Sequence, residues 1–275
     1  MQRDNEKDVP AALPSKRRRF PFSFGVPSYL YPADIAYNVR MLRETVDEME
    51  LILFESADVS SLPTARDVAH FRALAMETGM RFNVHLPLDI DVASADERIR
   101  DNSLDVVSGI VELTSPLDPT SYTLHVPRAE GGDRREWLAR VCRSLAALPR
   151  PHERFCVETL AWDLREIDDV LSDLGFSVCI DVGHLLLHGF DLPSFFDCFS
   201  GRISMIHVHG VEAGKDHLSL AHLAQPARTT LANTVMRAGY ARSLSLEVFS
   251  LRDFQESLPV LEGMFPHAAG GGLPC

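Results

Sequence analysis

The sequence contains no apolar stretch near the ~18 residues that a membrane-spanning helix needs, so we expect no membrane span. It also lacks the glycine-rich motifs that cradle nucleotide phosphates and the Gly-x-Ser-x-Gly motif of serine hydrolases. The five cysteines include no Cys-x-x-Cys pair, which disfavours both a cysteine-bound zinc and a disulfide framework. These absences leave the acidic residues and the histidines as the main candidates for any chemistry.

Basic residues are also few. Lys plus Arg number 27 against 39 Asp plus Glu, which gives a formal net charge of −12. Because nucleic-acid binding favours a basic surface, we expect no nucleic-acid partner. The lack of a long apolar stretch is the reason that we expect no membrane partner. The dense basic run Lys16–Arg19 is expected to lie in a solvated tail.

The pattern predicts a cytoplasmic protein. The N-terminal segment has no apolar region of the kind that defines a signal peptide. Cys156 and Cys179 lie inside predicted strands, where we expect buried, reduced thiols.

Strand and helix patterns alternate eight times between residues 20 and 265. The predicted strands cover residues 20–26, 50–54, 81–86, 122–126, 155–159, 177–182, 203–208 and 243–249. Such alternation indicates a parallel sheet, and eight repeats indicate a (β/α)8 TIM barrel, which needs about 250 of the 275 residues. We therefore expect a single barrel domain over residues 20–265, a polar and basic tail over residues 1–19, and a flexible tail over residues 266–275. Gly79 is expected to close the second helix.

Four acidic or histidine side chains end the last four predicted strands. They are Glu158, Asp181, His207 and Glu247. Strand C-termini of a (β/α)8 barrel meet at one face, where the chemistry is found. Because buried carboxylates without a partner are costly, this mixed N/O set predicts a divalent metal, Zn2+ or Mn2+.

Further histidines extend this candidate site. His85 and His125 end strands three and four in matching His-x-Pro contexts, and they are expected to form a second metal site with Glu158 as the bridging ligand. His184, which follows strand six, and His217 are candidates for a third metal or a phosphate site. We expect His209 to face away from the site.

The set of ligands resembles the xylose-isomerase-like barrel superfamily, which includes the type IV apurinic endonucleases and many sugar isomerases and epimerases. Residues 179–184, Cys-Ile-Asp-Val-Gly-His, look like the Asp-x-x-His segment of the endonuclease branch. The resemblance implies two or three divalent metal ions at the sites described above. The endonucleases have an Asp in the third site where this sequence has Lys215, with Asp216 displaced by one residue.

A closer resemblance, over residues 22–261, is to the cobamide-remodelling phosphodiesterase family of the same superfamily. It is carried by residues 28–34, 50–55, 84–89, 215–220 and 246–250. It implies hydrolysis of the phosphodiester in the nucleotide loop of a cobamide, a corrinoid substrate. Glu158 would serve catalysis as the shared ligand, and Lys215 would neutralise a phosphate oxygen. The loop after the first strand would contact the corrinoid through Tyr29, Tyr31 and Asp34.

Three alternatives remain open. A sugar isomerase or epimerase would use the four-residue site with one Mn2+. A DNA-repair enzyme is disfavoured by the acidic charge. The third alternative is a catalytically silent corrinoid-binding protein.

Overall fold

The computed structural model describes residues 13–58, 61–128 and 132–266. Within these ranges, eight parallel strands close into a barrel in the order β1-β10-β7-β6-β5-β4-β3-β2. The strands are β1 (Ser23–Pro27), β2 (Glu48–Ile52), β3 (Arg81–His85), β4 (Tyr122–Leu124), β5 (Phe155–Glu158), β6 (Ser177–Asp181), β7 (Ile203–Val208) and β10 (Ser243–Leu246). The predicted (β/α)8 barrel is confirmed.

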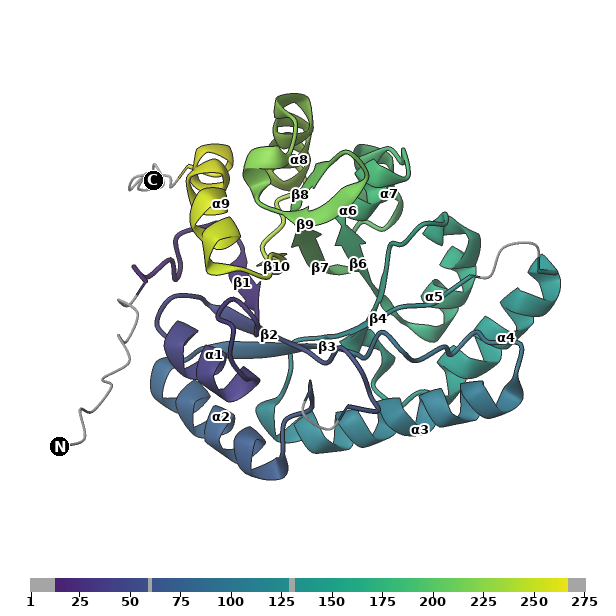
Figure 1. Ribbon diagram of the computed structural model, residues 1–275. Helices are drawn as coiled ribbons and strands as arrows, with labels where there is room; N and C mark the ends of the chain where they lie inside the picture. The colour runs from purple at the N-terminus through teal and green to yellow at the C-terminus, as the bar shows by residue number, and fades with distance from the viewer. Residues whose placement is uncertain (1–12, 59–60, 129–131, 267–275) are drawn as a thin grey trace, which may run out of the picture.

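Helices surround the strands (Figure 1). They are α1 (Ile35–Leu42), α2 (Ala65–Thr78), α3 (Glu97–Thr114), α4 (Arg134–Ala147), α5 (Asp168–Leu174), α6 (Val182–Leu187), α7 (Leu192–Cys198), α8 (Gln225–Arg237) and α9 (Leu251–Met264). Short 3-10 helices occupy the connections η2 (Ser115–Leu117), η3 (His152–Arg154), η4 (Leu164–Ile167) and η5 (Leu220–His222). The strand boundaries lie within a few residues of the predicted ones.

The second helix shows how the sequence sets its ends. Thr64 caps α2 and accepts a hydrogen bond from the backbone N–H of Asp67, whose side chain accepts one from the backbone of Thr64 in return. Gly79 ends the helix with a φ of 71°, a left-handed conformation that glycine adopts without steric cost. The expectation for Gly79 is confirmed.

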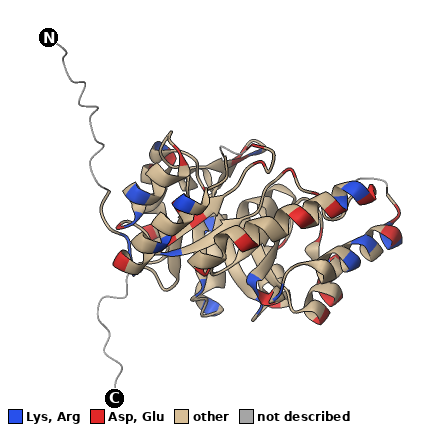
Figure 2. Cartoon of the chain, turned by 90° about the horizontal axis from the view of Figure 1, so that it is seen from below, with Lys and Arg blue, Asp and Glu red and all other residues tan. Residues whose placement is uncertain are grey.

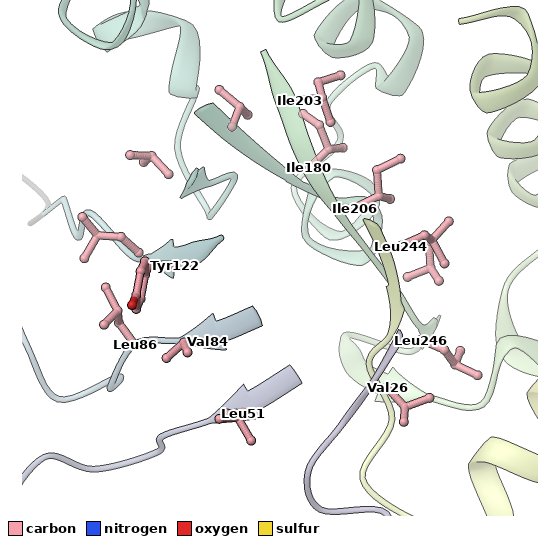
Figure 3. Packing of buried hydrophobic residues seen from close by; sticks show 14 of the residues in the cluster. Val26, Leu51, Val84, Leu86, Tyr122, Ile180, Ile203, Ile206, Leu244 and Leu246 are labelled. Atoms are coloured by element: carbon pink, nitrogen blue, oxygen red, sulfur yellow. The ribbon is translucent and has the colours of Figure 1, made fainter. Parts of the chain in front are cut away.

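Strand residues alternate between two environments. Figure 3 shows Leu51, Val84, Ile180 and Ile206 among the buried apolar side chains of the cluster that packs the strands against the helices. Val84, Ile180 and Ile206 are each followed in the sequence by a polar residue. These polar residues are His85, Asp181 and His207, respectively, and all three are buried. Because successive side chains of a strand point to opposite faces, these polar residues project into the barrel.

Below the polar residues, the barrel interior is filled by a small cluster of Cys156, Cys179 and Met205. Both thiols are buried and free, as expected. At the far end, buried Glu48 accepts hydrogen bonds from Asn83 (2.8 Å) and Ser243 (2.7 Å). That end of the interior is therefore satisfied by hydrogen bonds within the protein, as the stabilising face of a TIM barrel requires.

A β-hairpin that the sequence did not predict follows β7. It consists of β8 (Gly210–Glu212) and β9 (Lys215–Leu218), which pair antiparallel. Its two turn residues, Ala213 and Gly214, have φ values of 51° and 78°, the geometry of a tight type I′ turn. Figure 1 shows the hairpin beside α6. The hairpin positions Lys215 and His217.

Acidic and basic residues are mixed over the helices seen in Figure 2. In the basic run, Lys16 pairs with Glu262 of α9 at 2.8 Å, so this end of the expected tail contacts the barrel. Among the described residues, no helix is long and apolar enough to cross a membrane.

Candidate metal centre

His207 lies at the middle of the four predicted ligands from β5, β6, β7 and the segment after β10. Its Nδ1 atom is 3.3 Å from Glu247 Oε2, 3.7 Å from Glu158 Oε1 and 3.9 Å from Asp181 Oδ2. All four residues are buried, at 4% exposure or less. The parallel register places Asp181 opposite His207, so the barrel itself brings these ligands together.

The second group meets at the other oxygen of Glu158. His85 Nε2 lies 3.2 Å and His125 Nε2 3.0 Å from Glu158 Oε2. The Nδ1 of His85 is 2.9 Å from the carbonyl oxygen of Leu86, which leaves Nε2 directed at the carboxylate. Glu158 therefore has one oxygen toward His207 and the other toward this histidine pair, the arrangement expected of a bridging ligand.

The third group consists of His184, His209 and His217 and lies beside Asp181. Ligand atoms of His184, His209 and His217 all lie within 4.8 Å of one another. His184 donates through Nδ1 to the carbonyl oxygen of Thr159 (3.0 Å), and its Nε2 is 3.9 Å from Asp216 Oδ2. Of the two hairpin residues that precede His217, Asp216 is thus the one that approaches this group, rather than Lys215.

The expectation for His209 is wrong. Positions two residues apart on a strand share a face, so His209 follows His207 toward the site. Its Nδ1 accepts a hydrogen bond from the backbone N–H of His217 (3.0 Å), so Nε2 carries the proton and donates to Asp181 at 3.1 Å. With both ring nitrogens engaged, His209 orients Asp181 and anchors the hairpin. A Cβ on Gly183 would lie 1.9 Å from the His209 ring, which explains the glycine in the segment 179–184.

Glu50 of β2 also belongs to the site, although the sequence analysis gave it no role. It is fully buried, and its Oε1 atom lies 2.9 Å from His207 Nε2, in a contact that is not aligned as a hydrogen bond. Its other oxygen accepts a hydrogen bond from Ser245 (2.6 Å). A glutamate between the apolar residues Met49 and Leu51 was the signal that could have identified it.

The charges of this cluster shift the pKa values of its members. Burial opposes the protonation of His85, but the hydrogen bond and the charge of Glu158 outweigh it and raise the His85 pKa to about 9. For His184, burial is likewise outweighed by the charge of Asp181 and by Glu158, and its pKa rises to about 10. Burial raises the pKa of Glu247. The cluster therefore retains protons that a cation would displace.

The donor set fits a divalent cation. His207 Nδ1 and Glu247 Oε2 are buried, have no hydrogen-bond partner and lie 3.3 Å apart. Two ligand atoms about 2.05 Å from a tetrahedral Zn2+ are separated by roughly 3.3 Å. Groups of three His, Cys, Asp or Glu residues with ligand spacing recur among the described residues, and Glu158, His85 and His207 each belong to more than one of these groups.

The predicted substrate residues are placed as follows. Tyr29 is partly buried, with its ring 5.0 Å from that of Phe54. Tyr31 is only 4% exposed and packs against Tyr37. Asp34 caps α1 by accepting from the backbone N–H of Tyr37 at 2.7 Å. Lys215 is exposed in the hairpin. Their roles toward a substrate remain predictions.

Two curated proteins resemble the chain in sequence. An uncharacterised protein of Methanocaldococcus jannaschii is 26% identical over 148 residues, which is 50% of this chain and 58% of that protein. The chain therefore matches little more than half the length of that relative. The L-ribulose 3-epimerase of Mesorhizobium japonicum is 24% identical over 259 residues, 85% of this chain and 84% of that enzyme.

Solved structures share the fold. A D-tagatose 3-epimerase-like protein superposes with a TM-score of 0.73 at 17% identity, over 88% of this chain and 97% of its own. The D-psicose 3-epimerase of Clostridium cellulolyticum gives 0.68 at 13% identity, over 88% and 98%. The sequence pattern of the xylose isomerase-like TIM barrel matches residues 43–264, most of the chain. Together with the closed barrel and its ligand cluster, this match shows that the chain belongs to the xylose isomerase-like TIM barrel family.

Proposed function

We propose that this protein is a metal-dependent phosphodiesterase that hydrolyses the nucleotide-loop phosphodiester of a cobamide. One observation carries the proposed reaction: Glu158 lies between His207 on one side and the pair His85 and His125 on the other. A single-metal site needs only the first group. The histidine pair supplies donors for a second cation that shares Glu158, and a two-cation site suits phosphodiester cleavage.

Two or three divalent ions, Zn2+ or Mn2+, would be held by the three groups already described. When bound, such ions supply a hydroxide at neutral pH and neutralise the charge of a phosphodiester. The chain contributes the positions of the ligands. Glu50 sets the orientation of His207, and His209 sets that of Asp181. Lys215, exposed on the hairpin near His217, would neutralise a further phosphate oxygen.

The substrate rests on a separate argument. The segments 28–34, 84–89 and 215–220, which resemble the cobamide-remodelling family, follow or lie beside the ends of β1, β3 and β7. These are positions at the catalytic face of the barrel. The three segments support a cobamide as the substrate because all of them lie at the same end of the barrel as the candidate metal centre.

The decisive experiment uses the full chain loaded with Zn2+ or Mn2+. It is incubated with a cobamide, and the products are identified by mass. We expect a corrinoid that has lost its nucleotide base, and no product with Glu158→Ala. An intact cobamide under every metal tested would refute the proposal.

A second candidate function is the epimerisation of a sugar. The L-ribulose 3-epimerase of Mesorhizobium japonicum aligns over 85% of this chain, and the structures reported above include sugar epimerases. That reaction would use Glu158, Asp181, His207 and Glu247 with one cation, and one of the carboxylates would move a proton at carbon. It assigns no ligand role to His85 and His125.

The two candidates predict different metal contents and different products. One tightly bound ion per chain, together with interconversion of ketoses, would favour the epimerase. Two or more ions that require His85 and His125, together with cobamide cleavage, would favour the phosphodiesterase. Elemental analysis of His125→Ala compared with the parent chain separates them without a substrate.

A further inference from the structure

A row of aromatic rings begins at the metal centre. The ring of His217 lies 5.2 Å from that of Phe249, Phe249 lies 5.7 Å from Phe54, and Phe54 lies 5.0 Å from Tyr29. We call Tyr29, Phe54 and Phe249 the aromatic row. The rings come from the segments that follow β1, β2 and β10, which are neighbours in the barrel.

The aromatic row is only partly buried. All three rings have intermediate exposure, whereas many phenylalanines of this chain, such as Phe24 and Phe254, are completely buried. Adjacent rings in the row are tilted by 47° and 50°, so neither pair stacks face to face. Tyr29 packs against the hydrophobic core. The three rings lie in contact with one another, and each is partly exposed, beyond the C-terminal ends of β1, β2 and β10.

We infer that the aromatic row binds a planar aromatic ring of the substrate, joined through a sugar to the phosphate held at the metal centre. The inference rests on the proposed function and names the part of the substrate that gives specificity. The row starts at His217, whose Nδ1 is 3.7 Å from Glu247 Oε2. A phosphate at the ligand cluster therefore has Phe249 beside it, and a substituent that extends from the phosphate meets Phe54 and Tyr29 next.

Ring stacking favours this occupant over a free sugar. A base stacked on an aromatic side chain gains affinity whatever its hydrogen-bonding groups are. A monosaccharide presents hydroxyl groups that need polar partners, and the row offers no polar atom except the Tyr29 hydroxyl. Burial, and then the charges of Asp58 and Asp34, raise the pKa of that hydroxyl, so it stays neutral beside a neutral ring.

The test measures binding by calorimetry and does not depend on turnover. The zinc-loaded full chain is titrated with two probes that differ only in the ring, benzimidazole riboside phosphate and ribose phosphate. The variants are Phe54→Leu and Phe249→Leu, which keep an apolar side chain but remove the aromatic face. Phe190→Leu is the matched control, because this partly buried ring packs against Phe195 and makes no ring contact with the row.

We expect the parent chain and Phe190→Leu to bind the ring-bearing probe at least tenfold more tightly than ribose phosphate. In Phe54→Leu and Phe249→Leu that ratio should fall by about tenfold, while the affinity for ribose phosphate stays the same. Equal affinities for the two probes in the parent chain, or an unchanged ratio in both variants, would overturn the inference. Ring-dependent binding without cobamide cleavage would uphold the aromatic row and reject the proposed reaction.

Discussion

Glu50 Oε1 lies 2.9 Å from the Nε2 atom of His207, on the side of the imidazole opposite the carboxylates that its Nδ1 faces. A carboxylate behind a ligating histidine fixes the orientation of the ring and raises its basicity. Ser245 of β10 donates a hydrogen bond to the other carboxylate oxygen of Glu50. The centre thus has a supporting layer that spans β2, β7 and β10.

Removal of this support should weaken metal binding. We expect Glu50→Gln to lower the metal affinity by about 10- to 100-fold, as other outer-layer substitutions do. Competition with a chromophoric chelator measures it. Glu55→Gln, exposed just beyond β2, is the control. An unchanged affinity in Glu50→Gln would mean that the contact with His207 does not orient the ligand.

Glu158→Ala should be the most damaging single change to turnover. Glu158 contacts both His207 and the pair His85 and His125, so its loss disrupts two groups at once. We expect a fall of several orders of magnitude in kcat. His184→Ala and His217→Ala should cost less. Glu153→Ala, an exposed residue of η3, should leave turnover unchanged. Turnover in Glu158→Ala close to that of the parent would contradict a shared ligand.

Gly183 and Gly109 provide a matched pair of substitutions. Gly183→Ala would place a Cβ 1.9 Å from the His209 ring, so either His209 or α6 must move. We expect a loss of stability of about 1–3 kcal/mol and weaker metal binding. Gly109→Ala on the exposed face of α3 meets nothing within 4 Å and should stabilise by up to about 1 kcal/mol. Chemical denaturation measures both. Equal effects of the two substitutions would exclude a tight contact at Gly183.

The metal-free protein should lose stability as the pH rises. The pKa of His85 is raised from its ordinary 6.5 to about 9 in the folded chain. The stabilisation from this proton is therefore fully present below pH 6.5 and disappears as the pH rises through about 9. Its slope approaches about 1.4 kcal/mol per pH unit for one proton. Denaturation of chelated protein between pH 6.5 and 9.5 tests this. His85→Gln should flatten the slope, and an equally steep slope in that variant would assign the effect to other groups.

DNA should not be a substrate. The formal charge of −12 opposes binding to a polyanion. Residues Lys16 and Arg19 of the basic run also pair with Glu262 of α9. Incision of DNA that contains an abasic site, measured at physiological salt, should stay at background. Incision that disappears in Glu158→Ala would overturn this prediction.

The sequence alone determined the fold and the identity of the principal ligand candidates. Alternating strand and helix patterns are local, and a polar residue that ends an apolar strand is visible without coordinates, as for Asp181 and His207. The closed order of the strands then places such residues at one face.

The tertiary structure alone decided which residues meet. Glu50 and His207 are far apart in the sequence, and their contact depends on how the barrel closes across β1 and β10. The hairpin β8–β9 depends on a two-residue turn without the usual Asn-Gly signal, so its effect on His217 was hidden. His209 was missed for another reason, because the two-residue period of a strand, which places it on the same face as His207, was read the wrong way. Its hydrogen bonds with Asp181 and His217 are visible only in the folded chain. Local patterns specify elements, whereas partners across the barrel are fixed by register and closure.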